Sequence, residues 1–108
     1  MKELEFPITR KKFLYVLLER KDCWALIEQV DLLYPDSPGR FEVWRIRVRG
    51  KRNLKGEEYP EMEVIPATTE WGQYGWTFFE LRDAIAWFKD MISGVSLEEA
   101  NRRYLKRR

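Results

Sequence analysis

The chain has 108 residues, of which 44% are hydrophobic and 15% aromatic, and its formal net charge is +2. This length suits one core, so we expect a single domain over residues 1–108, and so small a net charge argues against strong attraction of the whole molecule to nucleic acid or anionic membrane. With no histidine and one cysteine, Cys23, the composition excludes histidine-based nucleophile pairs, ordinary zinc sites and an intrachain disulfide.

The N-terminal segment, residues 1–12, mixes acids and bases and shows no signal-peptide pattern. No apolar run approaches the ~20 residues that span a bilayer. A lone thiol at Cys23 fits a reducing compartment. We therefore expect a soluble, cytoplasmic protein with no membrane partner.

Residues 10–33 admit two interpretations. As strands, residues 13–18 and 23–33 form a hairpin, and the charged tetrapeptide from Glu19 to Asp22 makes the turn. As a helix, Phe13, Val16 and Trp24 begin an apolar stripe that Thr9 caps. The turn-sized polar interruption favours the hairpin, because antiparallel neighbours in sequence usually pair in space.

Residues 41–49 alternate apolar and basic side chains, which is typical of a strand with one core face and one wet face. Trp44, Ile46 and Val48 are expected to pack in the core, and the arginines between them should face water. Residues 50–60 then form a polar loop or a wide hairpin end. Residues 62–67 offer a fourth short strand, which Pro66 places at an edge or interrupts.

Four rings, those of Trp71, Tyr74, Trp76 and Phe78, lie close together in the sequence with Gly72 and Gly75 between them. Large rings beside glycines are typical of a junction at which a sheet packs on a helix. We predict that these four rings are structural and that they do not line a ligand pocket, since few neutral polar groups accompany them.

Two helices should follow this aromatic junction. Thr77 and Glu80 match a capping box, and the apolar pattern then continues to about Ser93, where Gly94 ends the helix. Ser96 and Glu99 match a second box at the start of a basic helix. The predicted fold is α+β: an antiparallel sheet of three to four strands followed by two C-terminal helices packed on one face.

No catalytic motif emerges from the sequence. The chain has no glycine-rich phosphate loop, and Asp36 with Glu42 only faintly matches the acidic spacing of metal-dependent nucleases, because Trp44 stands where such a site needs a lysine. We therefore expect a binding protein that is not an enzyme and that uses no metal and no cofactor.

The best candidate for a binding surface is basic. Three arginines on alternate residues of a strand lie roughly 7 Å apart, a spacing that follows successive phosphates or an acidic protein surface. An ordinary solvated strand face is the competing interpretation. The candidate binding residues are Arg45, Arg47, Arg49, Lys51 and Arg52 with the C-terminal Arg107 and Arg108. A protein partner or self-association is the first expectation, and nucleic acid is the alternative.

The chain contains Glu42-Val-Trp-Arg-Ile-Arg47, a following proline, and Glu70-Trp-Gly-Gln-Tyr-Gly-Trp-Thr-Phe78 before a predicted helix. This order of features resembles small uncharacterised proteins of phages and other bacterial mobile elements. It spans most of residues 13–92 and implies no reaction. It implies a compact accessory protein that binds or inhibits a component of the host or of the element.

Overall fold

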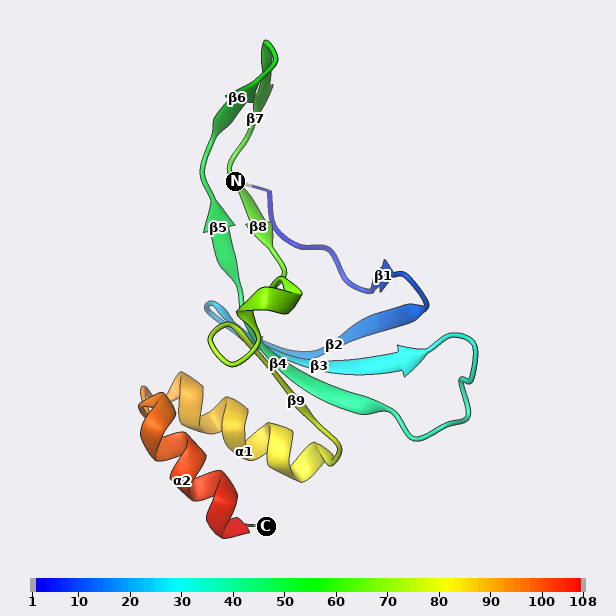
Figure 1. Cartoon of the computed structure of the whole chain (residues 1–108), viewed down its shortest axis with the longest axis vertical. Coiled ribbons are helices and arrows are strands. Elements are labelled where there is room, and N and C mark those ends of the chain that lie inside the picture. The colour runs from blue at the N-terminus through cyan, green and yellow to red at the C-terminus, as the bar shows by residue number, and fades with distance from the viewer. Residues whose placement is uncertain (1, 108) are drawn as a thin grey trace.

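The computed structural model describes residues 2–107, and Figure 1 shows a curved antiparallel sheet with two helices beneath it and a narrow arm above it. Five strands form the sheet in the order β1-β2-β3-β4-β9. These are β1 (Ile8–Arg10), β2 (Phe13–Lys21), β3 (Trp24–Asp31), β4 (Arg40–Arg45) and β9 (Gly75–Phe78). The helices are α1 (Leu81–Ile92) and α2 (Leu97–Arg107). The predicted α+β class is confirmed, with five strands in the main sheet where three to four were expected.

Residues 10–33 are strands and not a helix. The register pairs Lys21 with Trp24, so β2 and β3 are joined by a tight turn at Asp22 and Cys23, and Asp22 has a positive φ of 54°. The predicted tetrapeptide turn was too long, because Glu19 lies inside β2, next to a bulge that shifts the register after Leu17. A bulge absorbs the extra residue and lets the strand continue.

The two helices cover one face of the sheet. Trp87 of α1, 1% exposed, and Val43 of β4, 0% exposed, belong to the core between the two layers. Trp87 packs against Trp76 and Phe78 of β9 with ring centroids 5.5 and 5.7 Å apart. The arginines at 45, 47 and 49 are exposed and Trp44 and Ile46 are buried, as predicted. The core position predicted for Val48 was wrong, because Val48 lies beyond the sheet and is 49% exposed. Val43, on the same face of β4 as Arg45, is buried against the helices, so that face is not wet along its whole length.

The opposite face of the sheet is covered in part by the N-terminal segment. Trp44 and Ile46 are buried in a second, smaller core, against which Leu4, Phe6 and Ile8 pack. The segment is held to the chain at Lys2, whose backbone pairs with β8 (Met62–Val64). Part of this helix-free face stays open, and the candidate site described below lies there.

An arm of two short ribbons projects from the sheet, away from the helices (Figure 1). β5 (Arg47–Arg49) pairs with β8, and β6 (Arg52–Leu54) pairs with β7 (Glu57–Tyr59). Residues 50–60 were predicted as a loop or hairpin end, and the structure makes them a hairpin whose turn has positive φ at Lys55 and Gly56. That pair of dihedrals matches the twist of an antiparallel ribbon. The predicted strand over residues 41–49 is interrupted at Ile46.

The helix boundaries agree with the sequence at two of the three predicted signals. α1 ends before Gly94, which has a φ of 81°, and Ser96 Oγ accepts from the backbone N–H of Glu99 at 3.2 Å. The predicted capping box at Thr77 was wrong, because Thr77 lies in β9 and Glu80 is the N-cap without a side-chain cap. Among residues 2–107, no helix is long and apolar enough to cross a membrane.

Candidate functional site

Strand register gathers polar and aromatic side chains on the helix-free face. Tyr15 pairs with Gln29, and Gln29 pairs with Arg40, so these three residues form one row across β2, β3 and β4. In the next row, Glu42 pairs with Thr77 of β9. Directly paired residues share a face, so both rows line the same surface.

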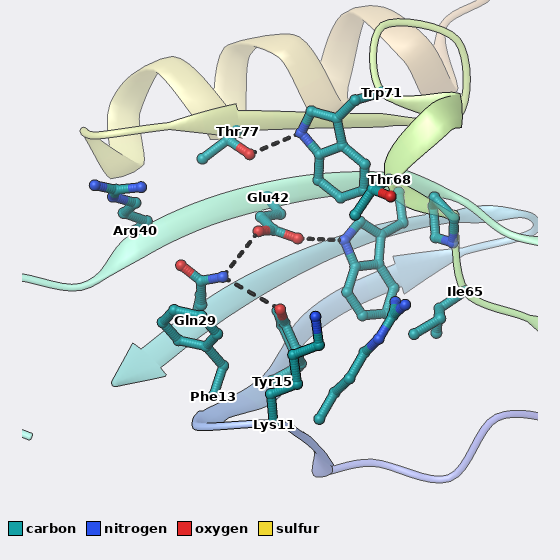
Figure 2. A pocket seen from close by; sticks show the side chains of 13 residues that line it. Lys11, Phe13, Tyr15, Gln29, Arg40, Glu42, Ile65, Thr68, Trp71 and Thr77 are labelled. Atoms are coloured by element: carbon teal, nitrogen blue, oxygen red, sulfur yellow. Dashed lines mark hydrogen bonds between the residues drawn. The ribbon is translucent and has the colours of Figure 1, made fainter. Parts of the chain in front are cut away.

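A cavity of about 350 Å³ opens over these rows (Figure 2). Its aromatic lining comes from Phe13, Tyr15, Trp44 and Trp71, and its wall beside Trp71 is completed by residues 65, 66 and 68 from the segment that follows the arm. The volume lies in the range of small-molecule pockets, which are mostly apolar with a few placed polar groups. This cavity is called the Glu42 pocket below.

Glu42 supplies the acidic group of the pocket although the residue is only 4% exposed. Trp44 Nε1 donates to its Oε1 at 2.7 Å, and Gln29 Nε2 donates to its Oε2 at 3.3 Å. The same Gln29 nitrogen lies 3.2 Å from Tyr15 Oη. Figure 2 shows these three bonds as one connected network. Buried polar groups that are bonded in this way are held in fixed orientations.

Burial raises the pKa of the Glu42 carboxyl above its ordinary value, while the Trp44 hydrogen bond and the charge of Arg40 act in the opposite direction. Within residues 2–107, no lysine or arginine forms an ion pair with Glu42. Each carboxylate oxygen has two lone pairs, and the protein uses one on each. Glu42 therefore keeps acceptor capacity for a ligand that donates hydrogen bonds.

The ring of Trp71 is fixed in the pocket wall by two contacts. Its Nε1 donates to Thr77 Oγ1 at 2.9 Å. The ring also covers the backbone of Gly75, where an added Cβ would lie 2.6 Å from Trp71 Cζ3. A side chain at residue 75 would therefore displace the ring, so the glycine is required for this close approach.

The pocket is basic overall, since its lining includes Arg10, Lys11 and Arg40 against the single acid Glu42. Arg10 and Lys11 stand at the turn between β1 and β2, where Lys11 has a φ of 56°. Arg40 also stacks on the exposed ring of Phe79 at 5.1 Å. The rim therefore presents cations from two separate parts of the chain.

A second cavity of about 310 Å³ adjoins the first. The two share Phe13, Gln29 and Arg40, and the second adds residues 37–39 of the loop before β4 and the ion pair of Lys12 with Asp31, 3.8 Å apart. An elongated ligand can therefore run from the Glu42 pocket across Arg40 toward Lys12.

The predicted binding residues do not lie at this pocket. Arg45 and Arg47 contact the ring of Tyr74, with their guanidinium carbons 5.8 and 4.2 Å from its centroid, and Arg47 forms an ion pair with Glu70. Arg49 lies at the arm base, where its Nη2 is 3.3 Å from the sulfur of Met62. The remaining predicted cations lie along the arm (Lys51, Arg52), at the end of α2 (Arg107) and outside the described residues (Arg108).

The four rings of the predicted aromatic junction are divided between two environments. Trp76 and Phe78 pack with Trp87 beneath the helices. Tyr74 contacts the two arginines named above. Trp71 is 39% exposed and lines the Glu42 pocket, so it has a position that the sequence interpretation did not assign to it.

Sequence reasoning missed Arg10, Lys11, Gln29 and Arg40 as site residues. One signal was present: Glu42 stands two residues before Trp44, and residues two apart in a strand share a face. That spacing places an acid on the same face as a buried indole. The cations carry no such signal, because only the pairing of β1, β2 and β4 brings them to one rim.

Asp36 and Glu42, the two acids that the sequence suggested for metal chemistry, lie in different environments. Asp36 is exposed in the loop before β4, and Glu42 is buried. Across residues 2–107, no group of three or more Cys, Asp or Glu side chains is placed to hold a metal ion. The pocket has an acceptor, stacking rings and cations, which are the groups of a binding site.

Comparison of the chain with protein-family models, curated proteins and solved structures gives no match. The resemblance to proteins of phages and mobile elements therefore stays a prediction. The function must be argued from the pocket itself.

Proposed function

We propose that the protein is a cytoplasmic, non-enzymatic domain that binds single-stranded nucleic acid, with an unpaired base in the Glu42 pocket and the adjoining phosphates on its basic rim. One observation carries the proposal: a single cavity combines aromatic rings, a hydrogen-bonded buried carboxylate and three cations. The sequence favoured a protein partner and ranked nucleic acid second. The contents of this pocket support the reverse order.

Each part of the cavity matches one part of a nucleotide. Trp71 and Tyr15 offer ring faces, and stacking of a base on an aromatic side chain contributes about 1–3 kcal/mol. Glu42 offers acceptors to the amino and imino groups of a base edge. Arg10, Lys11 and Arg40 offer charge to phosphate oxygens.

The cations of the pocket favour a nucleotide over an ammonium ligand. Aromatic rings with a carboxylate also suit quaternary or methylated ammonium groups. The pocket is lined by three cationic side chains and one acidic side chain. The net interaction of an ammonium ligand with these charged side chains would therefore be repulsive. A ligand with a planar donor-bearing ring and an anionic tail satisfies all of these groups.

The buried carboxylate also favours single strands over duplexes. In a duplex the Watson–Crick edges are paired and the bases are stacked, so an acceptor at the floor of a cavity cannot reach them. The adjoining second cavity offers the next nucleotide a place beside Arg40, whereas its other cation, Lys12, pairs with Asp31. We therefore expect short unpaired segments to be preferred over duplexes.

Fluorescence anisotropy with labelled RNA and DNA oligonucleotides of mixed sequence, single-stranded and as duplexes, tests the proposal at low and moderate salt. Single strands should bind more tightly than duplexes. Replacing Lys11 and Arg40 with glutamine should weaken binding and reduce the slope of log affinity against log salt by about 0.7 for each phosphate that the protein no longer neutralises.

Arg107→Gln is the matched control, because Arg107 is a cation on α2, outside the pocket lining. It should leave the affinity near that of the native chain. Absence of binding to every oligonucleotide at low salt would overturn the proposal.

A protein partner remains the second candidate, and the arm favours it. Val48, Leu54 and Tyr59 are 49%, 47% and 39% exposed on a ribbon whose strands also carry opposite charges. Exposed apolar side chains on an unpaired ribbon edge invite pairing with another chain. Light scattering after size-exclusion chromatography tests self-association: a mass of 13.2 kDa at high concentration contradicts it.

A further inference from the structure

We infer that the base held in the Glu42 pocket is guanine, an inference that rests on the proposed function and adds the identity of the base. Within residues 2–107, the protein donates one hydrogen bond to each oxygen of Glu42 and leaves one lone pair on each unused. Because each oxygen receives one donor from the protein and has a second lone pair, the carboxylate can accept two further hydrogen bonds, which two adjacent donors on one ligand edge would supply.

Only one of the four common bases offers two adjacent donors on its Watson–Crick edge. Guanine presents its N1–H and its N2 amino group next to each other. Adenine and cytosine each place an acceptor nitrogen beside their amino group, and uracil flanks its single N–H with two carbonyl oxygens. If one of those bases bound in this way, one oxygen of the Glu42 carboxylate would face the lone pair of an acceptor atom on the base. Two acceptors that face each other without a proton cost binding free energy.

The remaining group of the guanine edge, the O6 acceptor, also finds a partner in the pocket. Tyr15 Oη accepts from Gln29 Nε2 at 3.2 Å, so the hydroxyl proton of Tyr15 is not needed for that bond and is available for donation. Tyr15 lies on the same side of the pocket as the Gln29 amide that contacts Glu42 (Figure 2). The Gln29 amide nitrogen bonds to both Glu42 Oε2 and Tyr15 Oη, so the acceptor and the donor that the guanine edge requires are neighbours of one nitrogen.

The hydrogen bonds inside the protein keep Glu42 from adapting to another base. Trp44 Nε1 and Gln29 Nε2 hold one carboxylate oxygen each, at 2.7 and 3.3 Å. Rotation of the carboxylate would break both bonds inside a buried site. A site whose polar groups are fixed rejects a ligand that leaves them unpaired.

Ligand substitutions test the inference without changing the protein. Oligouridine strands that differ only at one central base should bind most tightly with guanine there, by about tenfold or more over the other three bases. Inosine lacks the N2 amino group and should lose most of that preference. 7-Deazaguanosine keeps the whole Watson–Crick edge and should bind like guanosine.

Glu42→Gln tests the assignment to this carboxylate. The amide keeps the size and an acceptor for Trp44, but it replaces one acceptor with a donor, so the guanine preference should disappear while some affinity for single strands stays. Glu19→Gln, an exposed change of the same kind on β2, should keep the preference. Should Glu42→Gln fail to fold, the comparison of guanosine with inosine on the native chain still decides.

The outcomes separate the two proposals. If no strand binds, both the proposed function and the guanine assignment are overturned. If all strands bind with equal affinity, nucleic-acid binding stands and the guanine assignment is overturned. If the preference survives in Glu42→Gln, the base is read by a different group and the inference is again overturned.

Discussion

Arg20 on β2 and Glu63 on β8 form a bidentate ion pair, with Nη1 2.7 Å from Oε1 and Nη2 2.5 Å from Oε2, across 43 residues of sequence. Glu63 Oε1 also accepts from the backbone N–H of Leu4 at 3.0 Å. One carboxylate thus joins the arm, the main sheet and the N-terminal segment. Charge-assisted bonds of this geometry fix orientation as well as contributing stability.

Breaking the Arg20–Glu63 ion pair should destabilise the fold. Glu63 is 8% exposed, and removing hydrogen bonds to a charged group that is largely buried costs about 1.5–3 kcal/mol. We expect Glu63→Gln and Arg20→Met each to lower the free energy of unfolding by an amount in that range. Denaturant titration measures it. Arg82→Met, which breaks an exposed pair with Glu80, is the control and should change stability by less than about 1 kcal/mol.

The same pair predicts an acid-sensitive stability. The hydrogen bonds from Arg20 hold the pKa of the Glu63 carboxyl below its ordinary value. The unfolded chain therefore takes up this proton at higher pH than the folded chain, so the contribution is complete above the ordinary glutamate pKa and is lost as pH falls through the folded pKa. The difference in melting temperature between the native chain and Glu63→Gln should shrink over that acid range. A constant difference would contradict the prediction.

The raised pKa of Glu42 predicts the opposite change of stability with pH. Burial raises its pKa, so the folded chain holds the proton to higher pH than the unfolded chain does. Its effect on stability is therefore absent at low pH and becomes unfavourable as pH rises from the ordinary glutamate pKa through the folded pKa. Melting curves should show Glu42→Gln gaining stability relative to the native chain across that rise. A relative loss there would contradict the direction.

Gly75 should be essential to the position of Trp71. Because an alanine Cβ at residue 75 would lie 2.6 Å from the indole ring, Gly75→Ala must displace the ring and break its bond to Thr77. Overpacking of this kind costs about 1–3 kcal/mol in stability, and the affinity for single strands should fall with it. Gly50→Ala is the matched control, since nothing lies within 4 Å of its added Cβ. Equal affinities for the two variants would count against Trp71 as a stacking ring.

Ser96 should carry a measurable part of the stability of α2. Its Oγ accepts from the Glu99 N–H at 3.2 Å, and replacing a serine N-cap with alanine costs about 1 kcal/mol. Ser96→Ala should therefore lower the melting temperature, while Ser93→Ala, at an exposed position after α1, should lower it less. Thermal unfolding followed by circular dichroism compares the two.

The sequence predicted what local patterns control. The hairpin over residues 13–33, the end of α1 before Gly94 and the Ser96 cap all depend on residues near one another in the chain. The class of the fold followed from the order of these elements. The capping box at Thr77 failed because tertiary pairing of β9 with β4 took that threonine into the sheet.

Local sequence patterns could not predict the candidate site, because its residues come from distant parts of the chain. Its cations come from the β1–β2 turn and the start of β4, and its wall comes from residues 65–71, so only long-range register assembles it. The run of basic residues after residue 44 predicted a binding surface on the arm. The arm, residues 47–64, has five basic residues in its first half and four acidic residues in its second half. Because the two halves pair as antiparallel ribbons, the basic residues lie beside acidic ones.

The unequal exposure of the indoles gives the protein a natural optical reporter. Trp71 is 39% exposed, whereas Trp44 and Trp87 are 2% and 1% exposed, and Trp24 and Trp76 are partly buried. Iodide in solution should therefore quench the emission of Trp71 more than that of the other four. A nucleobase stacked on that ring would shield it from the quencher, so occupancy can be followed in the unlabelled protein.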